Sequence, residues 1–343
     1  MISTRRRFIV ATATLPLALG LATFPSHRRA RAQDGAKPET IKVDYAYYNP
    51  SSLVLRRFGW LEEDLAADGV AVEWTLSAGS NKANEFLRAD AIDFGSTAGA
   101  AALLAKANGS AIETVYIFSK PEWAALVVVA DSPIADVAGL QGKKVAATKG
   151  TDPYFFLLRA LNEVGLSGAD VEVVNLQHAD GRLALERGQV DAWAGLDPHM
   201  AASELEAGSR LLYRNIDFNT YGFLNAREAF TAAYPDYTSR VLAAYERARL
   251  WILENPDEAA QILAEEAKIT PEIAQRELFE RTVLTGSPIP GPEHAAVLEQ
   301  VIPIFVAENL VAPDTDVAAA LADLLAPQYL DGIVAPALAT PTA

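Results

Sequence analysis

The sequence contains no cysteine, only two methionines and only four histidines. The lack of cysteine excludes disulfides, thiolate metal sites and cysteine nucleophiles. Basic residues are also scarce over most of the chain. The 343 residues carry a net charge of −15, yet the first 32 contain six arginines and no acidic residue, so the remainder, with 23 basic and 44 acidic residues, reaches −21. A body this acidic repels a phosphate backbone, and nucleic acid is therefore not an expected partner.

Long apolar runs are missing as well, apart from one near the N-terminus. Three arginines (Arg5, Arg6 and Arg7) precede an apolar stretch over 10–24, and a small-residue cleavage motif ends at Ala32. This order predicts a signal peptide over 1–32 that is cleaved after Ala32. The paired arginines followed by Phe8 favour a twin-arginine (Tat) signal, with an ordinary Sec signal as the alternative. We expect a mature protein that is exported, soluble and periplasmic.

The rest of the chain alternates strand and helix patterns twice. The first half predicts four strands with helices between them, at 41–47, 70–76, 91–94 and 114–118. The apolar run at 123–130 suits a strand buried on both faces. A second series of strands follows at 142–147, 171–176 and 190–193, with helices at 134–140, 153–164 and 182–187. This order predicts an α/β fold with mostly parallel sheets flanked by helices.

From about residue 227 the pattern becomes purely helical. Amphipathic helices are expected at 227–234, 237–254, 256–268, 271–280, 292–309 and 316–325. Such a helical segment cannot build a βα domain alone, so it should pack against one of the two βα systems. Residues 331–343 are rich in proline and alanine and are predicted to form a disordered tail.

Polar, small-residue loops follow the predicted strands in both halves. Ligands of open parallel sheets bind outside the carboxyl ends of the strands, and helix N-termini there favour anions. A ligand closed between two lobes would meet such groups from both sides. The candidate ligand-binding residues of the first half are Tyr48, Asn49, Gly79, Ser80, Asn81, Gly95, Ser96 and Thr97. Those of the second half are Gly150, Thr151, Asp152, Asp180 and Asp197, with Trp123 between the halves.

The stretch from Asp93 to Gly99 is the most distinctive of these loops. The strand before it is expected to stop in Gly-Ser-Thr, and the small-residue helix 100–105 follows directly. Gly95 would let the backbone approach a ligand, and the hydroxyls of Ser96 and Thr97 would donate hydrogen bonds to it. Asp93 is expected to brace the loop.

The ordered set of motifs resembles a known family. The matching segments are 93–97, 131–134, 140–146, 149–151, 190–193 and 197–198. They resemble the periplasmic substrate-binding proteins of ABC importers in the aliphatic sulfonate, taurine and nitrate group. The resemblance implies a two-lobed type II periplasmic-binding-protein fold, with lobe 1 at 41–122 plus 223–330 and lobe 2 at 123–222. It also implies a small organic anion or zwitterion in the cleft, an ABC permease with its ATPase as partners, and a helical last third that packs on lobe 1. A monomer without cofactor or metal, reaching the membrane only through the permease, is expected.

Several alternatives remain open from the residues alone. Two roles are open for Asp152: it recognises an amine on the ligand, as in a taurine-like zwitterion, or it only caps a helix. The same two roles are open for Asp197. Trp123 is a wall of the cleft or part of the core, and His178 is a further candidate polar contact. A nitrate or a pyrimidine (thiamine-precursor) ligand is an alternative to a sulfonate. An enzyme on the same fold and a sensory module are rival classes, although no nucleophile or phosphate-loop motif supports an enzyme.

Overall fold

The computed structural model describes residues 37–334, and the predicted signal peptide and the end of the predicted tail lie outside this range. The first sheet has the order β11-β4-β10-β3-β1-β2. β2 and β3 pair parallel to β1, whereas β10 runs antiparallel between β3 and β4, and β11 pairs antiparallel with β4. The strands are β1 (Thr40–Tyr45), β2 (Ala71–Leu76), β3 (Phe94–Ala98), β4 (Ile112–Pro121), β10 (Gly222–Arg227) and β11 (Thr282–Val283).

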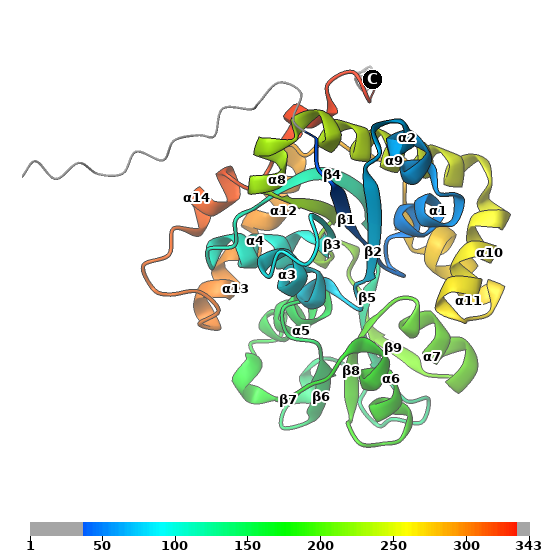
Figure 1. Ribbon diagram of the computed structural model, residues 1–343. Coiled ribbons are helices and arrows are strands. Elements are labelled where there is room, and N and C mark those ends of the chain that lie inside the picture. Colours follow the sequence, from blue (N-terminus) through cyan, green and yellow to red (C-terminus); the bar gives the residue numbers. More distant parts are fainter. Residues whose placement is uncertain (1–36, 335–343) are drawn as a thin grey trace, which may run out of the picture. The chain divides into compact units, whose positions relative to one another are not determined.

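The second sheet repeats the same plan with the order β7-β6-β8-β5-β9. β7 and β8 pair parallel to β6, and β5 runs antiparallel between β8 and β9. Its strands are β5 (Ala124–Val128), β6 (Lys144–Ala147), β7 (Glu172–Asn175), β8 (Ala192–Leu196) and β9 (Arg210–Tyr213). We call each sheet with its helices a lobe. The two lobes lie one above the other in Figure 1.

The helices that follow the parallel strands begin at residues that favour helix starts. Pro50 and Pro153 occupy first-turn positions, where the missing N–H costs nothing, and Asn49 accepts a hydrogen bond from the Ser52 N–H. The helices are α1 (Pro50–Phe58), α2 (Trp60–Leu65), α3 (Ser80–Arg88), α4 (Gly99–Ala107), α5 (Asp152–Glu163), α6 (His178–Glu186) and α7 (His199–Ala207).

The last third of the chain returns to the first lobe, as predicted. α9 and α10 pack on α1, and α14 packs on α4. Ion pairs reinforce this packing, since Arg240 bonds to Asp64 and Arg56 to Glu266. The helices are α8 (Glu228–Ala233), α9 (Pro235–Glu254), α10 (Pro256–Ala267), α11 (Pro271–Gln275), α12 (Pro292–Glu299), α13 (Ile302–Ala307) and α14 (Val317–Ala322), with a π-helical turn at Arg276–Glu280. None of the helices among residues 37–334 has the length and apolar character needed to cross a bilayer.

The predicted elements differ from the observed ones in several places, and the short strands β9 and β11 are among the elements not predicted. β3 continues to Ala98, so the expectation that Gly95, Ser96 and Thr97 form a loop is wrong. The single helix expected at 292–309 is two helices, because Pro303 cannot donate the N–H that a continuous helix requires. The helix expected at 134–140 is only a 3₁₀ turn at Ala138–Leu140. β10 was not predicted, because its sequence has only two large apolar residues, Phe223 and Leu224, and shows no sustained alternation.

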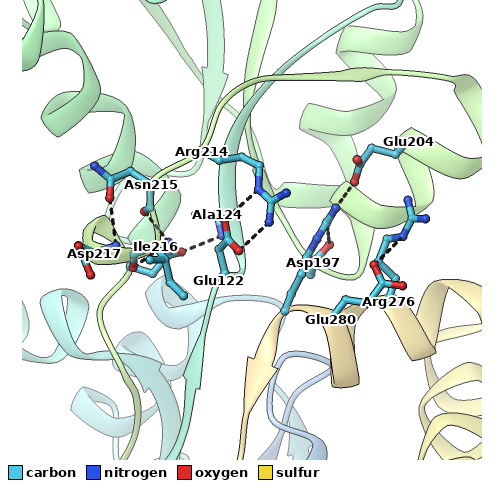
Figure 2. Close-up of polar contacts among 12 residues, drawn as sticks. Glu122, Ala124, Asp197, Glu204, Arg214, Asn215, Ile216, Asp217, Arg276 and Glu280 are labelled. Atoms are coloured by element: carbon cyan, nitrogen blue, oxygen red, sulfur yellow. Dashed lines mark hydrogen bonds and ion pairs between the residues drawn. The ribbon is translucent and has the colours of Figure 1, made fainter.

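Two chain segments connect the lobes and are bonded to one another (Figure 2). Arg214 donates to both oxygens of Glu122, at 2.9 and 2.6 Å, and the Ala124 N–H donates to Asn219 at 2.9 Å. Segment 121–124 leaves the first sheet, and segment 214–221 returns to it. Because these paired segments are the links between β4 and β5 and between β9 and β10, they are positioned to act as the hinge of the two lobes.

Candidate ligand-binding cleft

Two adjoining cavities lie where residues of both lobes meet. The smaller has a volume of about 10 Å³, enough for about one water molecule. It is lined by Tyr48, Ser80, Ala98, Trp123, Thr151, Asp152, Pro153 and Leu196. The larger has a volume of about 160 Å³ and is lined by Tyr47, Tyr48, Leu76, Ser77, Ala78, Gln177, His178, Ala179, Leu196, Asp197, Pro198 and His199. Tyr48 and Leu196 belong to both walls, so the cavities adjoin, and we call the two together the cleft.

Four helices begin at residues that line this cleft, and one of them is α7, which starts at His199 in the second lobe. α3 starts at Ser80 in the first lobe, and α5 and α6 start at Asp152 and His178 in the second. The first N–H groups of a helix have no partner within the helix and carry partial positive charge. The cleft therefore presents hydrogen-bond donors from both lobes, although neither cavity is lined by a lysine or an arginine.

The hydroxyl of Ser96 is engaged behind the cleft wall. It donates to Asp44 Oδ1 at 2.7 Å and accepts from Asn49 Nδ2 at 2.8 Å, while the Ser96 N–H donates to Asp44 Oδ2. All three residues are buried. Burial raises the pKa of Asp44 to about 6, although the hydrogen bonds from Ser96 oppose this shift. Tyr48, which lines both cavities, donates its hydroxyl to the Ser96 carbonyl at 2.9 Å, so Ser96 and Asn49 support the cleft from behind.

Thr97 and Gly95 also lie away from both cavities. Thr97 Oγ1 accepts from Asn225 Nδ2 at 2.7 Å, and Asn225 Oδ1 accepts from Thr114 at 2.6 Å. A side chain at Gly95 would collide with Leu87, because an added Cβ would lie 2.9 Å from it. These two residues therefore serve packing within the first sheet, and Ala98 is the residue of this stretch that lines the cleft.

Asp152 joins α5 to both connecting segments. Its carboxylate accepts from Trp123 Nε1 at 2.8 Å, from the Thr220 N–H at 2.7 Å and from the Thr220 hydroxyl at 2.6 Å. Burial raises its pKa to about 6, and the bonds from Thr220 and Trp123 oppose the shift. Asp152 occupies the first helical position after Thr151, so its side chain does not cap α5. With three donors already bound, its carboxylate braces the cleft.

Asp197 is held by the last third of the chain. Arg281 Nη1 lies 3.1 and 3.2 Å from its two oxygens, and the Ala201 N–H of α7 donates to Oδ1 at 2.8 Å. Arg281 also bonds to Glu204, whose side chain lies near that of Asp197 in Figure 2. Burial raises the pKa of Asp197 to about 6, although the positive charge of Arg281 lowers it. Asp197 thus lines the larger cavity with a carboxylate that is already paired.

The remaining predicted residues divide between the cleft and the surface. Trp123 is both cleft wall and core, because it is buried and its ring packs edge-on against Tyr48 at 5.8 Å. Ser80 accepts from the Ala98 N–H at 2.9 Å. Gly150 has φ of +78° and approaches Asn81 across the cleft. Asp180 is exposed and lines neither cavity.

His178, which the sequence offered only as a further candidate polar contact, lines the larger cavity. It is 1% exposed, and its Nδ1 lies 3.2 Å from Thr148 Oγ1. Thr148 donates its only hydroxyl proton to the Leu176 carbonyl at 2.6 Å. This arrangement favours the neutral tautomer with its proton on Nδ1 and a lone pair on Nε2. Burial lowers the pKa of His178 to about 3, and nearby His199 contributes. The sequence signal for this residue was its position at a strand-to-helix loop.

The paired α/β lobes, the antiparallel strand within each sheet and the cleft between them define the periplasmic-binding-protein fold. Residues 63–259 match the NMT1/THI5 like family. Because this match covers more than half of the chain, the protein belongs to that family, and the resemblance inferred from the sequence is confirmed. Among residues 37–334, no group of three His, Cys, Asp or Glu side chains is arranged to hold a metal ion.

Relatives and solved structures agree with this assignment. A protein of Escherichia coli (strain K12) named for binding aliphatic sulfonates is 29% identical over 286 residues, which cover 82% of this chain and 88% of that protein. The alkanesulfonate-binding protein SsuA from Xanthomonas axonopodis pv. citri, bound to MOPS, is 25% identical with a TM-score of 0.75, covering 83% of this chain and 98% of that one. The periplasmic aliphatic sulphonate binding protein SsuA from Escherichia coli is 27% identical with a TM-score of 0.71, covering 86% and 100%.

Proposed function

We propose that the protein is a solute-binding protein of an ABC importer that holds a small organic sulfonate between its lobes. The observation that carries this proposal is the convergence of the helix starts of α3, α5 and α6 on one cleft from both lobes. Such starts supply N–H donors and partial positive charge, which suit a sulfonate group. The names of the relatives support the same ligand class.

The charge of the cleft favours a monoanion. Neither cavity is lined by lysine or arginine, and the larger one is lined by the carboxylate of Asp197, which Arg281 pairs. Helix starts without a cationic side chain offer only partial charges. A singly charged sulfonate on a short carbon chain, packed against Trp123 and Tyr48, fits this field better than a dianion such as sulfate.

The lobes must separate to admit such a ligand. The smaller cavity has room for about one water molecule, so the structure has its lobes closed. The paired segments 121–124 and 214–221 are the hinge about which they would open. The lobe bounds of 41–122 plus 223–330 and 123–222 follow from this hinge as part of the proposal.

Partners and location belong to the same proposal. A closed, ligand-bound monomer would dock on a membrane permease, and the ATPase of the importer would drive transport. Export by a Tat signal with cleavage after Ala32 concerns residues outside the described range. Catalysis is not part of the proposal, because the hydroxyls of Ser80 and Thr151 in the cleft bond only to backbone groups among the described residues.

Titration calorimetry on the mature chain tests the proposal. Methane-, ethane- and propanesulfonate should bind with micromolar or lower Kd and raise the melting temperature, whereas nitrate, sulfate and a pyrimidine should not. Ser80→Ala, in the cleft, should weaken sulfonate binding about tenfold. Ser110→Ala, a buried serine that lines neither cavity, is the matched control and should leave binding unchanged. Binding of nitrate or a pyrimidine without binding of any sulfonate would refute the ligand class.

A further inference from the structure

The last third of the chain packs mainly on the first lobe, yet it also contacts the second lobe in two places. The first contact is made by Arg281, which directly precedes β11 of the first sheet. Its Nη1 lies 3.1 and 3.2 Å from the two oxygens of Asp197, and its Nη2 bonds to Glu204 of α7. The side chains of Arg281 and Asp197 are 5% and 1% exposed, so water screens this pair of charges little. One guanidinium thus ties the two lobes together.

An apolar contact accompanies this ion pair. Ile273 of α11 is buried in one cluster with Ala201 and Ala202 of α7. α11 otherwise packs on α10, which lies on the first lobe. Figure 1 shows α7 and α11 side by side to the right of β5, the first strand of the second lobe.

The second contact lies to the left of β5 in Figure 1, where α13 meets α5. Phe305 of α13 packs against Phe155 of α5 with ring centroids 5.3 Å apart, and both side chains are fully buried. Glu308, which follows α13, accepts a hydrogen bond from the Gly168 N–H of the second lobe at 3.2 Å. The last third therefore holds the second lobe from two sides.

These contacts depend on how the lobes are oriented. α11 and α13 are attached to the first lobe, because α11 packs on α10 and the preceding helix α12 packs on α4 and α14. A rotation of the second lobe about segments 121–124 and 214–221 would move α5 and α7 relative to them. Closely packed contacts do not stretch gradually but either hold or break. Opening of the cleft must therefore break contacts that involve no ligand.

We propose that the last third of the chain forms a two-sided strap, made by Ile273, Arg281, Phe305 and Glu308, that stabilises the closed arrangement of the lobes without a ligand. The inference rests on the lobe movement of the proposed function but not on the identity of the ligand. Arg281 lines neither cavity, so it is a positioning residue that acts through the orientation of the lobes. A ligand that binds the closed arrangement gains affinity in proportion to the fraction of molecules already closed.

Energy transfer between two fluorescent labels tests the strap in the absence of any ligand. The chain has no cysteine, so Arg88→Cys in the first lobe and Gln189→Cys in the second create two exposed labelling sites. Arg281→Met removes the charge and keeps an unbranched side chain. In this labelled background it should lower the ratio of closed to open molecules about tenfold or more. Glu204→Gln and Glu308→Ala each weaken one side of the strap and should shift the ratio in the same direction by less.

Arg240→Met is the matched control, because Arg240 also bonds to two acids, Asp64 and Asp68, but both belong to the first lobe. It should leave the ratio unchanged. Ratios equal to that of the wild type in Arg281→Met, Glu204→Gln and Glu308→Ala would overturn the inference, and so would an equal fall in Arg240→Met. If Arg281→Met does not fold, the two milder variants decide.

A kinetic measurement separates the strap from a purely structural role. Propanesulfonate should dissociate at least about fivefold faster from Arg281→Met than from the wild type in stopped flow, whereas Arg240→Met should not change this rate. Equal dissociation rates of Arg281→Met and the wild type would contradict the inference. Failure of every sulfonate to bind would refute the proposed function, and the label distances of the unliganded protein would still decide whether the strap exists.

Discussion

The starts of α4 and α6 are both strand-to-helix junctions, but their polar groups are engaged differently. At α4 the Gly99 N–H donates to the Tyr221 carbonyl at 3.0 Å and the Ala100 N–H to the Thr220 hydroxyl at 3.0 Å. At α6 the side chain of His178 keeps an unpaired acceptor atom. The first junction is satisfied by the segment that returns from the second lobe, whereas the second junction faces a cavity.

The comparison shows that polar residues at a strand-to-helix junction are not necessarily free to bind a ligand, because other parts of the fold can occupy their hydrogen-bonding groups. Ser96 appeared suited to donate to a ligand, yet Asp44 and Asn49 engage its hydroxyl. His178 lies in a less distinctive sequence, yet this residue lines the larger cavity. A group that holds the fold together has a different role from one that holds a ligand, and mutations can separate the two.

The largest effect is expected from Asp44→Ala. Removing this buried carboxylate leaves the Ser96 N–H and hydroxyl without their acceptor, so the free energy of unfolding should fall by about 3–5 kcal/mol. Urea unfolding measures the change. Asp180→Ala, at an exposed position, is the control and should stay within about 0.5 kcal/mol of the wild type. Equal stabilities of the two variants would show that the Asp44 network does not hold the fold.

Ser96→Ala should destabilise the protein without removing ligand binding. We expect a loss of about 1–3 kcal/mol, because Asn49 and Asp44 each lose a buried partner. The rise in melting temperature caused by a sulfonate should remain close to that of the wild type. Ser80→Ala should show the reverse pattern, with a smaller loss of stability and a weaker response to ligand. If Ser96→Ala abolished the response, the β3–α4 junction would belong to the binding site after all.

The fold was predictable because it depends on patterns that the sequence shows directly. Apolar strands alternate with helix signals in two series, and these signals predicted both βα systems and the helical last third. β10 was missed because Phe223 and Leu224 are its only large apolar residues, too few for an apolar run, and because it begins with Gly222, which is required for packing. A Cβ there would lie 2.2 Å from the Phe118 ring.

The site was less predictable for a physical reason. The sequence places polar residues at the strand ends, and Tyr48, Ser80, Trp123, Thr151 and Asp152 do line the smaller cavity. It does not show which donors reach which acceptors, because the partners come from distant segments. Asp152 is bonded by Thr220, and Asp197 by Arg281 from beyond the second lobe. Such pairings between distant residues decide whether an acid braces the cleft or contacts a ligand.

Gly79→Ala tests whether the lobes must meet closely at the start of α3. The added Cβ would lie 2.9 Å from His178 Nε2, so the cleft could not close fully and sulfonate affinity should fall about tenfold. Calorimetry measures the affinity, and thermal unfolding should show little change in the unliganded protein. Gly286→Ala is the control, since its Cβ would meet nothing within 4 Å and its backbone needs no positive φ. Similar affinities of both variants would mean that closure does not bring His178 to Gly79.

The smallest effect concerns pH and again separates the two junctions. The folded-state pKa of His178 is about 3, below its ordinary value of 6.5, so the unfolded chain binds a proton in this range and the folded chain does not. The stability that neutral His178 provides is thus complete above pH 6.5 and is lost as the pH falls towards 3, by at most about 1.4 kcal/mol per pH unit. Asp44, with its pKa raised to about 6, acts in the opposite direction, because its folded carboxyl binds the proton more readily. Its contribution is fully present below pH 3.8 and is lost as the pH rises through 6.

Comparison with His178→Phe separates the pH dependence of His178 from that of the other buried titratable groups. The variant keeps Asp44, Asp152, Asp197 and His199, so their contributions cancel in the difference. The difference in unfolding free energy between the wild type and the variant should shrink or reverse steadily as the pH falls from 6.5 to 4.5, measured by urea unfolding at each pH. The same titration with Asp44→Ala should give a trend of the opposite sign. A difference that does not depend on pH would mean that His178 takes up its proton in the folded state as readily as in the unfolded chain. Burial of His178 would then not disfavour its charged form, contrary to the lowered pKa that its surroundings produce.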